Sequence, residues 1–172
     1  MRRLVVVGVI VTASVGCAPQ IKRKSLDEKS YYIGMQQTAR VGQAILQRTT
    51  GEQAQAKIWT GLAGGGWKDT EWAPLSGSVK EELLYQGGNE SEIKLGYREY
   101  RLTKDPLETT PVDIYGNVSY RWNSAGFLAA PAFYQQLEYK REQGPTTIAF
   151  SRYRIRVMSA DNEAIVYVVE SD

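Results

Sequence analysis

The sequence has no histidine and only one cysteine, Cys17, among its 172 residues. Histidine is the commonest acid–base catalyst near neutral pH and the commonest metal ligand in proteins. Without it, and with one thiol, the chain lacks the Ser-His and Cys-His pairs of nucleophilic enzymes, the usual zinc ligands and any internal disulfide. We therefore expect a protein that is not an enzyme and binds no cofactor or metal, although carboxylate chemistry remains open.

The chain also has no strong excess of either charge, with 21 lysines and arginines against 19 aspartates and glutamates. Arg2 and Arg3 lie in an N-terminal segment that we expect to be removed, which leaves 19 residues of each sign. A protein without a basic field has no electrostatic attraction for a phosphate backbone. We expect no nucleic-acid partner.

A basic N-terminus, Met1-Arg2-Arg3, is followed by an uncharged run from Leu4 to Gly16 and then by Cys17. This order is typical of an export signal. The run is shorter than the ~20 apolar residues that a membrane-spanning helix needs. A buried strand or a secretory signal without lipid are the alternatives, but a strand would explain neither the arginines nor the cysteine.

The last four residues of this segment, Ser14-Val15-Gly16-Cys17, resemble the lipobox of bacterial lipoproteins, a family that most often has leucine where Ser14 stands. The resemblance implies that residues 1–16 are a cleaved signal peptide and that Cys17 becomes an acylated N-terminus. Two or three acyl chains hold a protein stably on a membrane. Ala18 in place of aspartate implies sorting to the outer membrane, facing the periplasm, if the cell has two membranes.

Residues 17–30 are predicted to be the acylated cysteine and a polar tether, because Ala18 to Ser30 is polar. The basic triplet Lys22-Arg23-Lys24 within it could also attract anionic lipid headgroups. Residues 31–172 have the length of one domain, which we expect to be mainly β.

Alternation of apolar and polar residues is clearest after residue 78. Tyr153, Ile155 and Val157, for example, alternate with arginines, which predicts a strand with one buried and one wet face. Strands are predicted over 79–86, 92–102, 132–140, 146–153, 154–159 and 163–170. Together they predict an antiparallel meander that forms a small sandwich or barrel.

One short helix is predicted near residues 52–63. Thr50 and Gln53 have the spacing of a capping box, and a run of good helix formers follows. Apolar residues recur there at every fourth position: Ala54, Ile58 and Leu62.

A hairpin insertion is predicted at about 103–126, because the connection between Leu102 and Phe127 is longer than an ordinary loop. Gly116-Asn117 fits a two-residue turn. The hairpin either belongs to the main sheet or projects aromatic side chains toward a partner. The candidate partner-binding residues are Tyr115, Tyr120, Trp122 and Phe127.

Trp67 and Trp72 flank a short charged stretch after three glycines, which lack the Lys-Ser/Thr of a phosphate-binding loop. We expect the two rings to cover an exposed edge of the core. The alternative is a platform on which a ligand stacks.

Three classes of function follow. The first is a lipid-anchored protein whose β domain binds an envelope protein or takes part in an envelope assembly. The aromatic–basic strands YREYRL, QQLEYKRE and SRYRIRV are similar to those of small uncharacterised envelope lipoproteins. The second class is a lipoprotein that binds a glycan or small ligand through Trp67, Trp72, Tyr115 and Trp122.

The third class is a cell-wall hydrolase that uses two carboxylates, for example Glu99 and Glu138. A glycosidase would need these carboxyl groups about 5–9.5 Å apart in a substrate cleft.

Overall fold

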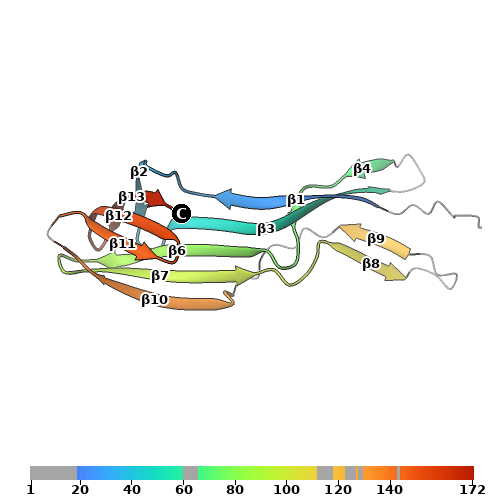
Figure 1. The fold of residues 1–172 in the computed structure, drawn as a ribbon. Helices are drawn as coiled ribbons and strands as arrows, with labels where there is room; N and C mark the ends of the chain where they lie inside the picture. Colours follow the sequence, from blue (N-terminus) through green and yellow to red (C-terminus); the bar gives the residue numbers. More distant parts are fainter. Residues whose placement is uncertain (1–18, 60–65, 112–117, 123–126, 128–129, 143) are drawn as a thin grey trace, which may run out of the picture.

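The computed structural model describes residues 19–59, 66–111, 118–122, 127, 130–142 and 144–172. In these residues all regular secondary structure is β, with thirteen strands and no helix (Figure 1). Two antiparallel sheets pack face to face, and a third sheet of two strands is separate from both. The predicted mainly β, antiparallel fold is confirmed as a sandwich, whereas the barrel alternative is wrong because the sheets remain open.

The larger sheet has the strand order β1-β3-β6-β7-β10, and each neighbouring pair is antiparallel. Two short strands, β4 and β5, also pair with β3. The bounds are β1 Gln20–Lys29, β3 Ala44–Trp59, β4 Trp67–Asp69, β5 Ala73–Pro74, β6 Val79–Gly88, β7 Glu92–Arg101 and β10 Phe133–Lys140.

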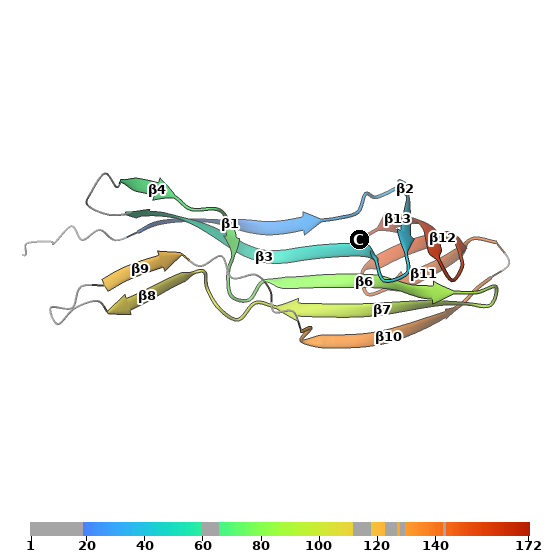
Figure 2. The ribbon, with the colours of Figure 1, turned by 180° about the vertical axis from the view of Figure 1, so that it is seen from behind.

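The smaller sheet has the order β11-β12-β13-β2 and covers only one end of the larger sheet (Figures 1 and 2). The chain passes between the sheets at Gly42, which has a φ of 85° in the turn after β2. The bounds are β2 Gln36–Arg40, β11 Thr146–Phe150, β12 Tyr153–Ala160 and β13 Ala164–Ser171.

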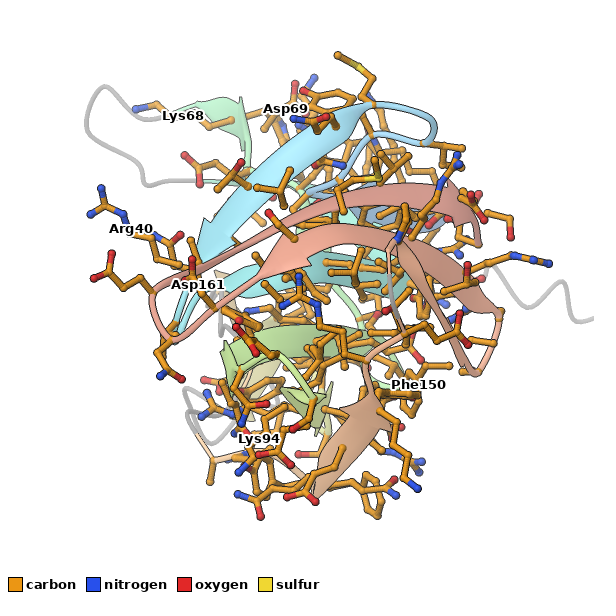
Figure 3. The ribbon with its side chains drawn as sticks, turned by 90° about the vertical axis from the view of Figure 1, so that its left-hand side faces the viewer. Arg40, Lys68, Asp69, Lys94, Phe150 and Asp161 are labelled. Carbon is orange, nitrogen blue, oxygen red and sulfur yellow. The ribbon has the colours of Figure 1, made fainter. Side chains whose placement is uncertain are left out.

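The core lies between these two sheets and follows the alternation in the sequence. Ile155 of β12 and Leu83 and Leu95 of the larger sheet are completely buried. The arginines between the buried residues of β12 remain exposed, as the two-residue period requires. In the end-on view the layers enclose this core (Figure 3). Burying one such aliphatic side chain contributes about 1.5–3 kcal/mol, so most of the stability comes from this region.

The predicted helix near residues 52–63 is wrong for residues 52–59, which continue β3, while residues 60–63 lie outside the described residues. β1 pairs with one edge of this segment, and β5 and β4 pair with the other. The helix propensity of a segment is easily outweighed by its surroundings. Here the backbone N–H and C=O groups that would bond within a helix bond instead to the neighbouring strands. Ala54 and Ala56 are both buried on one face, the alternation of a strand.

Residues 20–29, which we predicted to be part of a polar tether, form β1 and pair with β3 along their whole length. Leu26 is the only buried residue of this strand. The strand forms because it supplies backbone partners to the edge of β3. Its charged side chains then protect the new edge against pairing with another chain.

The third sheet is the hairpin of β8 (Leu107–Pro111) and β9 (Val118–Trp122). Of the two interpretations of the insertion, a hairpin outside the main sheets is therefore the one observed. Pro111 and Val118 form the last described pair of this hairpin, and the predicted two-residue turn at Gly116-Asn117 lies outside the described residues.

Candidate functional site

The larger sheet continues well beyond the sandwich. Thr50 and Val79 form the last pair between β3 and β6, and beyond them β3 pairs only with β1, β5 and β4 (Figures 1 and 2). The hairpin β8–β9 projects at the same end. We call this region the arm and define it as residues 20–24, 51–59, 66–74, 105–111 and 118–122.

Gly51 lies where the arm leaves the sandwich and has a φ of 140°. A Cβ atom at this position would lie 2.7 Å from the Cα atom and 2.5 Å from the Oγ atom of Ser78. That hydroxyl donates a hydrogen bond to the carbonyl oxygen of Glu52 at 3.0 Å. Only glycine allows this backbone approach, which fixes the start of the arm.

All four tryptophans of the sequence belong to the arm, and the core cluster of the sandwich contains none. Trp59 of β3 and Trp67 of β4 are directly paired across the two strands. Trp67 is 41% exposed. The ring of Trp72 is partly buried, and the Nζ atom of Lys24 lies 4.2 Å from its centre, a cation–π contact.

The hairpin places the predicted residues Tyr120 and Trp122 together. They occupy alternate positions of β9, paired with Thr109 and Leu107 of β8. Tyr115 lies outside the described residues. Phe127 is half-buried beyond the hairpin. Trp67 and Trp72 belong to the other part of the arm. We had expected them to cover the edge of the sandwich core, and they do not.

A small hollow lies at the base of the arm between β1–β3 and the start of β8. Its volume is about 120 Å³, and Ile21, Ala54, Leu75 and Leu107 contribute apolar walls. Arg23 and Asp105 also line it. The small side chains of β3 in this region leave room for the segment that leads into the hairpin.

A second hollow lies on the side of the larger sheet that faces away from the smaller one. It has a volume of about 390 Å³ and is lined by polar side chains that include Lys94, Arg98 and Gln136. The amide of Gln86 donates a hydrogen bond to the hydroxyl of Tyr134 at 2.7 Å beside it. Volumes of this order are those of small-ligand sites. Neither this hollow nor the smaller one is lined by a tryptophan.

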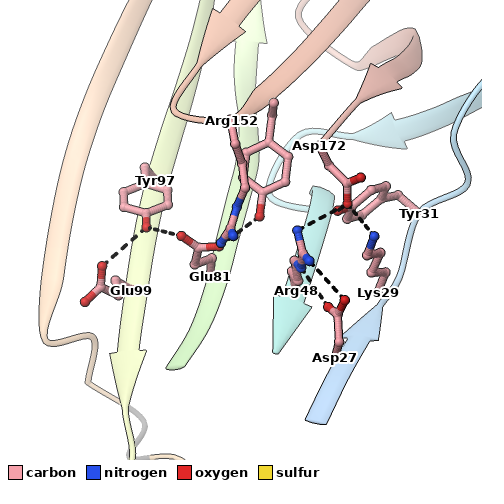
Figure 4. Close-up of polar contacts among 10 residues, drawn as sticks. Asp27, Lys29, Tyr31, Arg48, Glu81, Tyr97, Glu99, Arg152 and Asp172 are labelled. Atoms are coloured by element: carbon pink, nitrogen blue, oxygen red, sulfur yellow. Dashed lines mark hydrogen bonds and ion pairs between the residues drawn. The ribbon is translucent and has the colours of Figure 1, made fainter. Parts of the chain in front are cut away.

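Two clusters of charged and phenolic groups tie the sheets together (Figure 4). In the first, the carboxylate of Glu81 on β6 accepts hydrogen bonds from Arg152 at 2.6 Å, Tyr153 at 2.8 Å and Tyr97 at 3.1 Å. Burial alone would raise the pKa of Glu81, but the bonds from Tyr153 and Arg152 hold that pKa below its ordinary value. Burial, together with the charge of Glu81, raises the pKa of Tyr97.

In the second cluster, the carboxylate of Asp172 contacts Lys29 at 2.6 Å, Arg48 at 3.3 Å and the hydroxyl of Tyr31 at 2.5 Å (Figure 4). Arg48 also binds Asp27 through two nitrogens, at 2.7 and 2.9 Å. Burial would raise the pKa of Asp172, but the hydrogen bonds from Lys29 and Tyr31 lower it. These contacts hold Asp172, which directly follows β13 of the smaller sheet, against β1 and β3 of the larger sheet.

The two carboxylates named for a hydrolase do not form a pair. Glu99 lies opposite Phe133 and Glu138 lies opposite Lys94, so the two positions are five residues apart along β7. An odd spacing places them on opposite faces of the sheet, about 17 Å apart along the strand. The separation exceeds what a pair of glycosidase carboxylates needs.

Cys17 lies outside the described residues, three positions before the start of β1. The described part of the chain contains no group of three or more Asp, Glu, His or Cys side chains placed to hold a metal ion. Within the same residues there is no helix of the length and apolar character needed to span a membrane.

Comparison with known proteins returned no similar protein: no family model, no curated protein and no solved structure matches the chain.

Sequence reasoning missed the arm and both polar clusters. The tryptophans at 59, 67 and 72 were visible as a concentration of one residue type, a signal that could have pointed to a region outside the core. Nothing in the sequence linked Glu81 to Arg152 or Asp172 to Lys29, because each pair is distant along the chain.

Proposed function

We propose that this protein is a lipid-anchored component of the bacterial cell envelope, acylated at Cys17, whose β domain binds an envelope protein and catalyses no reaction. The observation that carries the recognition role is the hairpin β8–β9, which forms its own sheet outside the sandwich. Tyr120 and Trp122 occupy alternate positions of β9 in that hairpin. Tyrosine and tryptophan supply large contact area at low entropic cost and dominate the energy of many interfaces.

The anchor rests on the N-terminal sequence, which has the order of an export signal and ends in the lipobox-like Ser14-Val15-Gly16-Cys17. The same resemblance favours the outer membrane, facing the periplasm. The core cluster of the sandwich lies between its two sheets and contains no residue of the arm. The arm is therefore free to carry recognition.

The anchor is tested with Cys17→Ala in the native host. We expect the variant to keep its signal peptide and to leave the membrane fraction, while the unaltered protein carries acyl chains detectable by mass spectrometry. Unchanged fractionation of the variant would exclude the anchor.

The hairpin is tested by crosslinking in the intact envelope, with Tyr120→Ala and Trp122→Ala combined. We expect the crosslinked partner to be lost while the melting temperature stays close to that of the unaltered protein. Tyr32→Ala is the control, since this ring is 67% exposed and lies outside the arm. A large fall in melting temperature in the double variant would show that the rings are structural.

A second candidate function is the binding of a glycan or small polar ligand. The hollow over β6, β7 and β10 favours it, because Lys94, Arg98 and Gln136 offer hydrogen-bond donors near the exposed ring of Tyr134. The tryptophans proposed for stacking are not part of this hollow. Arg98→Ala should abolish binding of peptidoglycan fragments if this site is used.

A further inference from the structure

The chain enters the fold at the outer end of the arm. Gln20, the first residue of β1, pairs with Lys57 of β3, and Lys57 pairs in turn with Asp69 of β4. These positions lie close to the end of β3 that is remote from the sandwich (Figures 1 and 2). Cys17 is three residues before Gln20 and can be at most about 10 Å from it.

The anchor therefore leaves the arm little freedom. A solvated tether over residues 17–30 would let the domain stand tens of ångströms from the membrane, but residues 20–29 are paired in β1. If Cys17 carries acyl chains, the outer end of the arm must lie at the surface of the bilayer. An upright arm then holds the sandwich away from that surface, because residues 51–59 of β3 span about 30 Å.

One face of this end has the composition of a membrane interface. The strand register assigns five positions to one face of the sheet: Lys22 of β1, Lys57 and Trp59 of β3, and Trp67 and Asp69 of β4. We call these five residues the tip face. Lys22, Trp67 and Asp69 are exposed.

Tryptophan is enriched where water meets lipid, because the ring is apolar while its N–H remains hydrated. Lysine near an anionic lipid surface contributes about 1 kcal/mol per charge. The tip face has two tryptophans and two lysines against one aspartate. This combination matches the headgroup region of a bilayer better than the surface of a soluble domain.

We propose that the tip face lies in the headgroup layer of the membrane that carries the acyl chains, so that the arm has a fixed orientation on the bilayer. The proposal rests on the proposed function, since it needs the anchor at Cys17. The hairpin then meets its partner close to the membrane, and the turns at the far end of the sandwich face away from it.

The unaltered protein is suited to the test because all four of its tryptophans are in the arm. The acylated protein is reconstituted into vesicles of phosphatidylcholine with phosphatidylglycerol, with either ordinary or brominated acyl chains. Bromine quenches tryptophan only at short range. We expect loss of fluorescence in the brominated vesicles, and a smaller loss with Trp67→Phe.

The control protein has its four tryptophans replaced by phenylalanine and carries Tyr134→Trp. Its tryptophan lies on the sandwich, and we expect equal fluorescence in both kinds of vesicle. Circular dichroism checks that this protein is folded; if it is not, Tyr134→Trp in the otherwise unaltered protein should leave the absolute loss of intensity unchanged.

Charge is tested with Lys22→Glu, which should weaken the quenching in vesicles that contain phosphatidylglycerol. Lys140→Glu makes the same change at an exposed position at the far end of β10 and should have no effect. Equal effects of the two variants would contradict a role for the tip face.

The outcomes separate the two proposals. If the protein floats with the vesicles but fluorescence is the same in both lipids, the anchor stands and the orientation is excluded. If mass spectrometry finds Cys17 without acyl chains and the protein does not float, both proposals are overturned.

Discussion

The sandwich and the arm share one sheet, yet they bury different kinds of side chain. In the sandwich a second sheet covers one face of β6 and β7, and large residues such as Leu83 and Tyr85 are completely buried. In the described part of the arm no second large sheet covers β3, and the fully buried side chains of β3 between residues 51 and 58 are the small ones of Ala54 and Ala56. The largest side chains of the sequence, the tryptophans, are instead placed in the arm.

This contrast separates the region that stabilises the fold from the region to which we propose to assign recognition. Buried apolar area is the main favourable term in folding, so the sandwich supplies most of the free energy of unfolding. The arm contributes backbone pairing and leaves Ile21 and Trp67 between 41% and 45% exposed. Substitutions in the two regions should therefore differ in size, which the following predictions test.

The largest effect is expected in the core. Leu83→Ala removes a completely buried side chain at the centre of β6 and should lower the free energy of unfolding by about 2–5 kcal/mol. The matched change in the arm is Ile21→Ala, which should cost far less because that side chain is 45% exposed. Urea denaturation measures both, and similar losses would mean that the arm is part of the core.

The next effect is expected at the junction. Gly51→Ala forces an L-residue into a φ of 140° and places a methyl group against the backbone of Ser78. The backbone strain alone costs about 1–3 kcal/mol. Gly144→Ala is the control, because its φ is 107° and no atom lies within 4 Å of an added Cβ. If Gly51→Ala is no worse than this control, the approach of the arm to Ser78 is not tight.

A smaller effect is expected where Glu81 ties the two sheets. Glu81→Gln removes the charge that binds Arg152 and Tyr153, and should cost about 1–2 kcal/mol near neutral pH. Glu138→Gln, on the exposed side of β10, should be close to neutral. Thermal denaturation of both variants gives the difference.

The pH dependence sharpens this prediction. The pKa of Glu81 is lower in the folded protein than its ordinary value of 4.5, so its contribution is fully present above that value. It is lost as the pH falls through the lower, folded pKa. The unaltered protein should therefore lose stability in acid more steeply than Glu81→Gln, and parallel curves would contradict the role assigned to this carboxylate.

Much of the sandwich could be predicted from the sequence because strand alternation is local. The segments around β7, β12 and β13 each show it within ten residues or fewer. The segment 52–59 was misread because its residues favour a helix in isolation, and only its two neighbouring strands make it a strand. β1 was misread for a related reason, since a polar segment becomes a strand once β3 offers it an edge.

The candidate site was only partly predictable. Tyr120 and Trp122 were identified by their spacing, and both belong to β9. Their position outside the main sheets could not be read from the sequence, and neither could the pairing of Trp59 with Trp67. Both depend on which strands are neighbours in space.

By itself, the sequence determined the β class of the domain and the alternation that fills its core, and its N-terminus resembles a lipoprotein signal. It also determined that histidine is missing, and with it the acid–base and metal-binding chemistry that histidine supplies. The tertiary structure alone decided that residues 20–29 form a strand, that the tryptophans gather in an arm, and that Glu81 and Asp172 tie the sheets. The physical reason is that periodicity and composition act over neighbouring residues, whereas strand pairing and charge contacts join positions far apart in the chain.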